Sequence, residues 1–595
     1  MKRTDFSVDW LFAACAPDTE LLPWNAQFTP VDLPHDWQIR HADDLYRDGT
    51  LFYRKYFFVT DVPGIRRMLW FGGAYMDTTV FVNGTEVGQW KYGYTSFWFD
   101  ITDALHEGQN EVLVRCNLRH PNSRWYSGAG LYRNVELWEA PDLHLMPDGL
   151  YVAAKEGDNG AWTVAVTAEV GSVTAASTGR TLTLHLTDDN GSLLGTAAIP
   201  ADAWAALPSP DGWRTGKETA IYKASHTFTL QDPALWDLDA PNFYHITAEL
   251  TGADGVTDTL TTRFGCRTIE ATPDCGLLVN HKRVLIKGVC IHHDFGCLGS
   301  AFEYSAAKRQ LEILKSMGVN SIRTGHTPPA PQFMDLADEM GILMDVESFD
   351  CWRSGKNPYD YGRFFDEWQE KDVAAWIRRD RNHPSLLFWC IGNEIYDTHA
   401  GSEGADTMRM LLAEVAAHDP ARNGIPTLGS NYMPWENTQH CADIIKVAGY
   451  NYGERLYASH HEKHPDWVIY GSETSSIVQS RGIYHFPLSQ SLLSDDDLQC
   501  SSLGNSRTSW GAESWDVCLQ SEQRWPFTLG QYLWTGWDYI GEPTPYHTRS
   551  SYFGTIDTAG FPKDAYYVVQ AAWLDPKTHP MVHLFPYWDF NEGQL

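Results

Sequence analysis

Several features that define other classes of protein are missing from this chain of 595 residues. No stretch approaches the roughly 18 apolar residues that a membrane-spanning helix needs. The opening segment MKRTDFSVDWLFAACAPD lacks the apolar core of a signal peptide. The eleven cysteines are an odd number and form no CxxC pair. We therefore expect reduced thiols in a cytoplasmic protein that does not enter a membrane.

Positive charge is also scarce in the sequence. Lys and Arg number 45 against 76 Asp and Glu, which gives a formal net charge of −31. This balance argues against nucleic acid and anionic membrane surfaces as partners. An anionic small substrate is still compatible with it, because a pocket can be locally cationic. The apolar fraction of 43% is that of an ordinary globular protein.

The length of the chain exceeds what one hydrophobic core supports, so we expect several domains. Residues 1–140 and 141–265 read as two all-β regions, because β-branched and aromatic residues alternate between turn signals about every ten residues. Segments such as VFVNGTEVG, with its Asn-Gly turn, are typical of hairpins. Two β-sandwiches are therefore predicted for the first part of the chain.

The pattern changes near Phe264, and residues 266–580 alternate short apolar strands with amphipathic helices. No Gly-rich phosphate loop follows the first strand, which disfavours a doubly wound sheet. Eight strands over about 290 residues instead predict a (β/α)8 barrel. Residues 581–595 read as the start of a further, truncated C-terminal domain. The predicted strands are VLIKGVCI, GVNSIRT, ILMDVES, LLFWCIGNE, IPTLGS, DIIKVAGYNY, WVIYGSE and FTLGQYLWTG.

Functional residues of such barrels lie at the C-terminal ends of the strands. Reading only those positions gives a short set of polar and aromatic side chains. They are His292, His293, Asp294, Arg323, His326, Glu347, Asp350, Asn393, Glu394, Asn451, Tyr452, Glu473, Trp534, Trp537 and Asp538.

Two of these carboxylates have the arrangement that glycoside hydrolysis requires. Glu394 and Glu473 each follow an apolar strand, and their 79-residue gap corresponds to about three βα units. Strands 4 and 7 lie nearly opposite each other, so both side chains can reach one sugar. One carboxyl group protonates the leaving oxygen, while the other attacks the anomeric carbon or activates water. Spacing alone leaves retention and inversion open.

The neighbours of the pair suggest how it is supported. Glu473 must stay ionised, and Arg323 is a candidate partner. Asn393 can hydrogen-bond a sugar hydroxyl, and Trp534 can stack on the apolar face of the ring. The alternative without catalysis is that Glu394 and Glu473 are both structural carboxylates.

Two groups of histidines in the sequence could in principle bind a metal ion. Adjacent residues on an extended segment point opposite ways, so His292 and His293 are not expected to share a metal. The H-x3-H spacing of His460 and His464 falls on a predicted outer helix, together with His461, where solvated side chains are expected. No metal ion and no cofactor are therefore predicted.

Together these motifs resemble glycoside hydrolase family 2, the β-galactosidase/β-glucuronidase family, across nearly the whole chain. The resemblance implies a jelly-roll sugar-binding domain, an immunoglobulin-like β-sandwich and a catalytic TIM barrel, in that order. The matching segments are LPHDWQI, SRWYSGAGLYRNVEL, KGVCIHHDFGCLG, SIRTGHTPP, ESFDCW, RDRNHPSLLFWCIGNE, VAGYNYGE, YGSETSS and YLWTGWDYIGEPTPY.

The resemblance also implies a retaining double displacement, with Glu394 as acid/base and Glu473 as nucleophile. Arg323 resembles the arginine behind the nucleophile, and Arg124 in the SRWYSGAG loop is expected to reach the cleft. A homo-oligomer is expected because enzymes of this family often self-associate. The other implied substrate contacts are His292, His326, Asn393, Tyr452, Trp534 and Asp538.

Three departures from the family patterns bear on the metal requirement and on which sugar is bound. Where lac-operon-type enzymes place a magnesium-binding His two residues after a Glu, Glu347 is followed by Phe349. Ser476 stands where those enzymes carry a His facing the sugar's 6-position. The Asn-x-Lys clamp of β-glucuronidases is not evident after strand 8. The C-terminal segment instead resembles a bacterial multi-domain β-galactosidase subgroup.

We therefore expect an enzyme that releases terminal β-D-galactosides from small or oligosaccharide β-glycosides. The nearest alternative is a β-hexuronidase acting on galacturonides or glucuronides, which needs a cation at the 6-position of the sugar. A third reading, a catalytically silent carbohydrate-binding protein, is disfavoured because both carboxylates are present. The candidate cations for the uronide reading are Arg353, Lys356, His547, Arg549 and Lys563.

Overall fold

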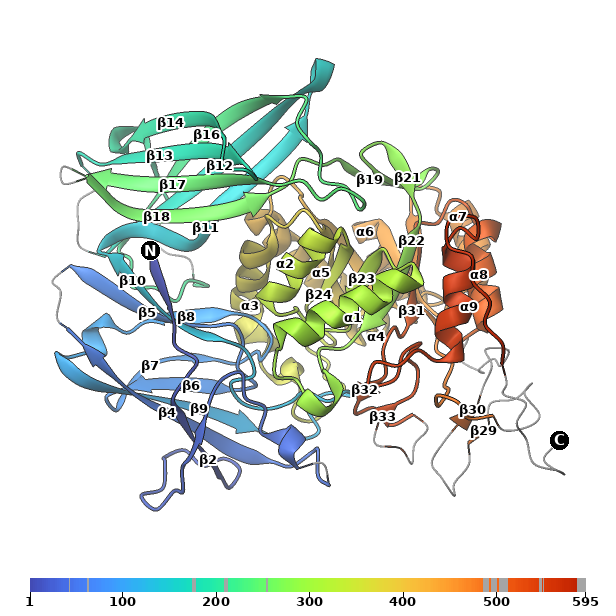
Figure 1. Ribbon diagram of the computed structural model, residues 1–595, viewed down its shortest axis with the longest axis horizontal. Helices are drawn as coiled ribbons and strands as arrows, with labels where there is room; N and C mark the ends of the chain where they lie inside the picture. Colours follow the sequence, from blue (N-terminus) through green and yellow to red (C-terminus); the bar gives the residue numbers. More distant parts are fainter. Residues whose placement is uncertain are drawn as a thin grey trace.

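A computed structural model gives the arrangement of the chain as two β-sandwiches beside a (β/α)8 barrel (Figure 1). It describes all residues except 42, 61–63, 174–177, 208–211, 253–254, 485–491, 494–499, 502–511, 545–547, 549 and 586–595. The predicted fold class is therefore confirmed. The domain boundaries at 140, 265 and 580 stay predictions, and most of the predicted C-terminal domain lies outside the described residues.

The first sandwich pairs a six-stranded antiparallel sheet with a four-stranded one. Its long central strand alternates buried and half-exposed residues along GQNEVLVRCNL, the period of a sheet with one face in a core. The larger sheet is ordered β3 (Thr29–Val31), β2 (Trp10–Cys15), β4 (Gly49–Val59), β9 (Gly108–Leu118), β6 (Thr78–Val82) and β7 (Thr85–Trp90). The smaller is ordered β1 (Lys2–Asp5), β10 (Val135–Pro141), β5 (Ile65–Phe71) and β8 (Phe97–Asp100).

The second sandwich has two four-stranded antiparallel sheets around a core of Val, Leu, Ile and Trp side chains. One sheet is ordered β11 (Leu143–Glu156), β12 (Ala161–Ser172), β16 (Ala220–Gln231) and β15 (Ala205–Ala206). The other is ordered β14 (Leu193–Pro200), β13 (Thr181–Asp188), β17 (Tyr244–Gly252) and β18 (Gly255–Phe264). A small sheet of β19 (Ile269–Thr272), β20 (Gly276–Val279) and β21 (Lys282–Val284) leads into the barrel.

Eight parallel strands close the barrel, and each overlaps one of the eight strands predicted from the sequence. The fourth, LLFWCIGN, is buried at every position, as a strand covered on both faces should be. In order they are β22 (Ile286–Ile291), β23 (Ser321–Thr324), β24 (Leu343–Glu347), β25 (Leu386–Asn393), β26 (Ile425–Ser430), β27 (Val447–Asn451), β28 (Val468–Ser475) and β31 (Gly530–Trp534).

The helices surround the barrel, and their ends follow local sequence rules. Helix α1 ends at Met317 and is capped by Gly318, which takes the left-handed φ of +101° that glycine adopts without strain. The predicted strand DIIKVAGYNY begins too early, because Asp443–Ile445 form the last turn of a helix and β27 starts at Val447. The helices are α1 (Tyr304–Met317), α2 (Pro331–Met340), α3 (Phe365–Asp380), α4 (Asp397–Ala400), α5 (Glu403–His418), α6 (Glu436–Ile445), α7 (Tyr457–Lys463), α8 (Trp515–Arg524) and α9 (Asp564–Trp573).

Charged side chains join the second sandwich to the barrel. Arg263 at the end of β18 pairs with Asp338 at 3.1 Å and Asp335 at 3.3 Å on α2. His383 bonds the same Asp338 at 2.7 Å, and this carboxylate raises the pKa of His383 to about 9. In the described part of the chain these two aspartates and His383 are the one group with metal-binding geometry. Arg263 already supplies their positive charge, so the group has a structural role.

From the sequence we expect reduced thiols and solvated histidines near residue 460. Ten cysteines in the described ranges carry free thiols. The expectation that His460 is solvated is wrong, because it is 7% exposed and its Nδ1 lies 2.9 Å from the hydroxyl of Tyr450. His464 stacks on Trp467 with ring centroids 3.8 Å apart. None of the helices in the described ranges combines the length and apolar character that a bilayer crossing requires.

Candidate active site

The two predicted catalytic carboxylates lie at the C-terminal ends of β25 and β28. Both are buried, with Glu394 9% and Glu473 4% exposed. Glu394 has a left-handed φ of +47°, which costs a non-glycine residue about 1–3 kcal/mol. Such strain persists only where the surrounding structure holds it, and it clusters at functional sites. The backbone N–H of Glu394 donates to the carbonyl of Gly429 at 2.9 Å, which fixes this turn.

A chain of hydrogen bonds links the two carboxylates. The side-chain amide of Asn451 donates to Glu394 Oε1 and to Asn393 Oδ1, both at 3.0 Å. The same Asn393 oxygen accepts a bond from Arg323 at 2.9 Å, and Arg323 also donates to Glu473 Oε1 at 2.8 Å. Strands β23, β25, β27 and β28 therefore supply one connected constellation, in which each side chain restrains the next.

The surroundings of Glu473 fix its plane and perturb its ionisation. Arg323 holds Oε1, while the Tyr452 hydroxyl donates to Oε2 at 2.9 Å. Burial raises the pKa of Glu473 to about 7, while Arg323 opposes the rise and Glu394 adds to it. Arg323 is thus the expected neighbour, but it does not offset the cost of burying the charge.

The arginine behind Glu473 faces more than one acid. Arg323 is fully buried and also contacts Glu347 and, at 3.8 Å, Asp345. Burial raises the pKa of Asp345 to about 6 and that of Glu347 to about 8. One guanidinium thus serves three carboxyl groups, so proton uptake near neutral pH belongs to the cluster as a whole.

The ring of His326 is oriented by its hydrogen bonds. Its Nδ1 lies 2.6 Å from Glu347 Oε2, and its Nε2 lies 3.2 Å from the amide nitrogen of Asn393. Since the Asn393 amide is a donor, we assign the proton of neutral His326 to Nδ1. Burial lowers the pKa of His326, which favours this neutral form. The ring stacks on Trp534 with centroids 5.3 Å apart and planes 5° apart.

The neighbouring His292 is enclosed by aromatic rings. Its centroid lies 4.0 Å from that of Tyr539 and 5.3 Å from those of Trp125 and Trp534. Neither of its ring nitrogens has a hydrogen-bond partner among the residues that the structure describes, although both are buried. An unpaired buried polar atom costs about 1–3 kcal/mol, so this ring is available to bind a water molecule or a ligand hydroxyl.

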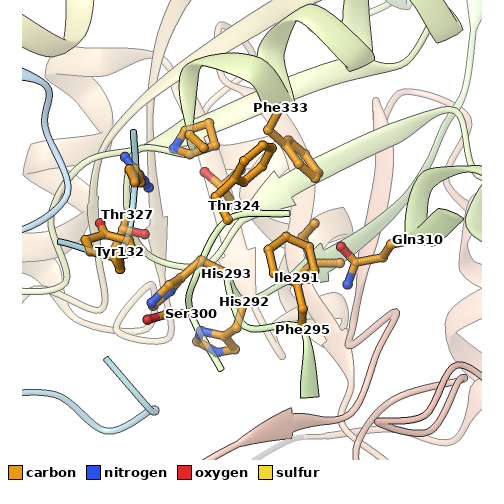
Figure 2. Close-up of a pocket in the computed structure, with 15 residues that line it drawn as sticks. Tyr132, Ile291, His292, His293, Phe295, Ser300, Gln310, Thr324, Thr327 and Phe333 are labelled. Atoms are coloured by element: carbon orange, nitrogen blue, oxygen red, sulfur yellow. The ribbon is translucent and has the colours of Figure 1, made fainter. Parts of the chain in front are cut away.

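The adjacent His293 is directed differently, as expected for successive residues of an extended segment. Its Nε2 lies 3.0 Å from the carbonyl of Ser127 in the first sandwich. Both histidines line a cavity of about 30 Å³ between that sandwich and the barrel, together with Ile291, Thr324 and Phe333 (Figure 2). This volume holds about one water molecule, so the cavity is not a substrate pocket.

Arg124 arrives at the barrel from the loop between β9 and β10. Its guanidinium lies 3.0 Å from Asp350, 3.5 Å from Glu394 and 4.0 Å from Glu542. Arg124 therefore lies beside Glu394, while its contact with the substrate stays a prediction. Neither Asp350 nor Glu542 was assigned a role from the sequence, although ESFDCW and GEPTPY contain them.

The loop that carries Arg124 is anchored by Asp36. This buried carboxylate accepts hydrogen bonds from the Tyr126 hydroxyl at 2.6 Å and from the Ala129 N–H at 3.1 Å. It also accepts one from the Ser300 N–H of the barrel at 2.9 Å. Asp36 therefore connects the LPHDW segment, the SRWYSGAG loop and the segment after β22.

Asp538 has partners other than the carboxylate pair. Its Oδ1 accepts hydrogen bonds from Lys563 and from the Gly554 N–H, both at 2.7 Å. Burial raises the pKa of Asp538 to about 7. No hydrogen bond among the described residues connects it to Glu394 or Glu473, so the structure does not bring Asp538 into the constellation around them.

Three of the five cations considered for a sugar carboxylate pair with aspartates. Lys356 pairs with Asp350 at 2.7 Å, Lys563 with Asp538 at 2.7 Å, and Arg353 with Asp366 at 2.5 Å. His547 and Arg549 lie outside the described residues.

Comparisons with known proteins find relatives over the whole length of this chain. Residues 271–461 match the family model "Glycosyl hydrolases family 2, TIM barrel domain", and residues 148–267 match "Glycosyl hydrolases family 2". The β-galactosidase BoGH2A of Bacteroides ovatus is 34% identical over all of this chain and 74% of its own length. A β-glucuronidase of Bacteroides fragilis is 26% identical over 94% of this chain and 82% of its own.

Solved structures give the same result for the fold. A β-glycosidase from Bacteroides vulgatus superposes with a TM-score of 0.84 at 28% identity, covering all of this chain and 77% of its own. A glycosyl hydrolase family 2 member from Bacteroides cellulosilyticus gives 0.82 at 27% identity, covering 97% of this chain and 71% of its own.

Proposed function

Because the chain belongs to glycoside hydrolase family 2 and is a glycoside hydrolase, we propose that it is a retaining exo-β-glycosidase acting on terminal β-D-galactosides. The observation that carries this proposal is the hydrogen-bonded constellation joining Glu394 and Glu473. Two carboxyl groups on strands β25 and β28 are what acid-assisted displacement at an anomeric carbon requires.

In the first step Glu394 donates its proton to the glycosidic oxygen while a Glu473 oxygen attacks the anomeric carbon. The C–O bond to the leaving group breaks, and a covalent glycosyl-enzyme forms. In the second step Glu394 removes a proton from water, which attacks the same carbon and releases Glu473. Arg323 and Tyr452 stabilise the carboxylate as its negative charge returns.

The substrate contacts follow from the unsatisfied and aromatic groups around the pair. We assign sugar hydroxyl contacts to His292, whose ring nitrogens have no partner within the described ranges, and to the amide of Asn393. The Asn393 nitrogen already donates to Asp350 at 3.1 Å, so a hydroxyl binds there by replacing a protein acceptor. Trp534 and His326, stacked on each other, form an aromatic wall of the sugar site.

Charge pairing supports a neutral sugar over a uronic acid. Within the described residues, Lys356, Arg353 and Lys563 each already pair with an aspartate. A sugar carboxylate bound at any of them would have to share the cation with that aspartate. The β-hexuronidase alternative keeps support from the similarity to the β-glucuronidase of Bacteroides fragilis. The silent-lectin alternative has no comparable support, because both carboxylates are in place.

Initial rates on β-galactoside, β-glucuronide and β-galacturonide chromogens, measured side by side at neutral pH, test the proposal. We expect turnover of the galactoside. Uronide turnover without galactoside turnover would replace the substrate assignment, and inertness toward all three would favour the lectin. Trapping with a 2-deoxy-2-fluoro glycoside, followed by peptide mass analysis, should place the label on Glu473; a label elsewhere contradicts the nucleophile assignment.

The cellular setting is also a proposal. The free thiols of ten cysteines support a reducing, cytoplasmic compartment. Self-association into a homo-oligomer stays a prediction.

A further inference from the structure

Four aromatic rings lie together on the rim of the barrel, beyond the acid/base position. We call Tyr396, His399, Tyr432 and Trp435 the rim aromatics. Tyr396 and His399 lie in the segment after β25 that contains the short helix α4, and Tyr432 and Trp435 lie between β26 and α6. They come from two successive βα connections, so they share the catalytic face of the barrel.

The rings form a continuous arrangement. His399 stacks on Tyr432 with centroids 4.0 Å apart and planes 25° apart. Tyr396 lies 6.3 Å from Tyr432 on one side, and Trp435 lies 5.6 Å from His399 on the other. The backbone ties the two segments into short turns, since the Trp435 N–H donates to the Tyr432 carbonyl at 2.9 Å.

The outer rings of the group are open to solvent. Trp435 is 57% exposed and Tyr396 is 41% exposed. Exposed aromatics that lie singly need no explanation, but a contiguous group beside a catalytic centre indicates a binding surface.

The group begins next to the general acid. Tyr396 follows Glu394 by two residues, and burial together with the nearby Glu394 charge raises the pKa of Tyr432 to about 12. Lys356 lies 6.0 Å above the Tyr396 ring and donates to the Asn393 carbonyl at 3.0 Å. The rim aromatics thus lie on the side of the site where Glu394 would protonate the leaving oxygen.

We propose that the rim aromatics bind the leaving-group side of the substrate, and that this group is a pyranose residue of an oligosaccharide. The assignment rests on the proposed function, because it takes Glu394 as the acid that protonates the glycosidic oxygen. Whatever is attached to that oxygen lies on the Glu394 side of the site. A pyranose presents an apolar face to a ring and hydroxyl groups to the tyrosine hydroxyls and to Lys356.

The experiment compares kcat/KM for a β-galactosyl trisaccharide with kcat/KM for methyl β-galactoside. In Trp435→Ala and Tyr396→Ala we expect this ratio to fall about tenfold, the loss of one stacking contact. Trp24→Ala, which removes an indole that is 97% exposed on the first sandwich, is the matched control and should leave the ratio at its wild-type value.

Three outcomes would overturn the proposal. An unchanged ratio removes the rim aromatics from substrate binding. An equal fall for both substrates assigns them to folding or to the chemistry. A larger loss for aryl galactosides than for the trisaccharide replaces the sugar by a flat aromatic leaving group.

A binding measurement separates this proposal from the proposed function. Calorimetry on Glu473→Gln, with and without Trp435→Ala, compares the trisaccharide with methyl β-galactoside. We expect the tryptophan change to weaken trisaccharide binding about tenfold, by the same loss of stacking. Equal affinities in the two proteins overturn the subsite even if galactoside turnover is normal. If the enzyme hydrolyses a uronide chromogen instead of the galactoside, the trisaccharide and the methyl glycoside are made with that uronic acid as the terminal sugar.

Discussion

Replacing Tyr452 by Phe tests the ionisation of the predicted nucleophile. The change removes only the hydroxyl group, which donates to Glu473 Oε2 at 2.9 Å and lies 3.2 Å from Ser476 Oγ. Arg323 still holds the other oxygen at 2.8 Å. The direct effect on Glu473 is therefore the loss of one charge-assisted hydrogen bond, and the contact with Ser476 is lost with it.

The sign and size of the effect follow from that bond. A donor to the carboxylate favours its ionised form, so removing it raises the pKa of Glu473 further above the value of about 7 that burial already causes. A hydrogen bond to a charged group contributes about 1.5–3 kcal/mol, and 1.36 kcal/mol corresponds to one pKa unit. With some replacement of the bond by solvent, we expect a shift of about one unit.

The pH dependence of kcat/KM between about pH 5 and 9 measures this shift, because its acid limb reports ionisation in the free enzyme. Wild-type activity should fall as pH decreases through about 7, since only ionised Glu473 attacks. In Tyr452→Phe the limb should move to higher pH, and kcat/KM at pH 6 should fall about tenfold.

Tyr450→Phe is the matched control. Tyr450 is two residues earlier on β27, is also buried, and its hydroxyl contacts His460 at 2.9 Å rather than a catalytic group. The control should lose some thermal stability with its acid limb in place. An unmoved limb in Tyr452→Phe, or the same movement in both variants, would refute the assignment of this limb to Glu473 and its cluster.

Four further predictions concern the site and its supports. Glu394→Ala should lower kcat/KM on methyl β-galactoside by about 10²–10⁴, while azide restores turnover of activated aryl galactosides and yields the β-glycosyl azide, detected by chromatography. Asp36→Asn should lower kcat/KM, yet add little to the loss in Arg124→Met; additive losses in the double variant would place its effect elsewhere. Dialysis against EDTA should leave rates unchanged, because Arg323 and His326 occupy the oxygens of Glu347; loss restored by magnesium would contradict this. The melting temperature measured by calorimetry should be higher at pH 6 than at pH 8, because the buried carboxyls with raised pKa values bind protons in this range only in the folded protein. A lower melting temperature at pH 6 would contradict those pKa values.

The strand pattern predicted the architecture and the main constellation. In a barrel the C-terminal strand ends meet on one face, so Arg323, Asn393, Glu394, Tyr452 and Glu473 could be grouped from the positions of apolar runs alone. The helical last turn at Asp443–Ile445 was missed because DIIK reads equally well as the start of a strand.

Partners in space were harder to predict than positions in the chain. Nothing local in WDYIGEP indicates that Asp538 pairs with Lys563, 25 residues later, instead of facing the sugar. Likewise the sequence does not indicate that Lys356 has a partner, and only the folded structure shows its ion pair with Asp350. Such pairings depend on tertiary contacts that periodicity does not encode.

The anchored loop carrying Arg124 has a consequence for protein engineering. Arg124 belongs to the first sandwich but lies 3.5 Å from Glu394 of the barrel. Exchanging the first sandwich between homologous enzymes by recombination therefore also exchanges this arginine. Such chimaeras should fold yet work poorly unless the segment bearing Asp350 travels with the donor sandwich. The first sandwich and the barrel rim thus work as one functional unit.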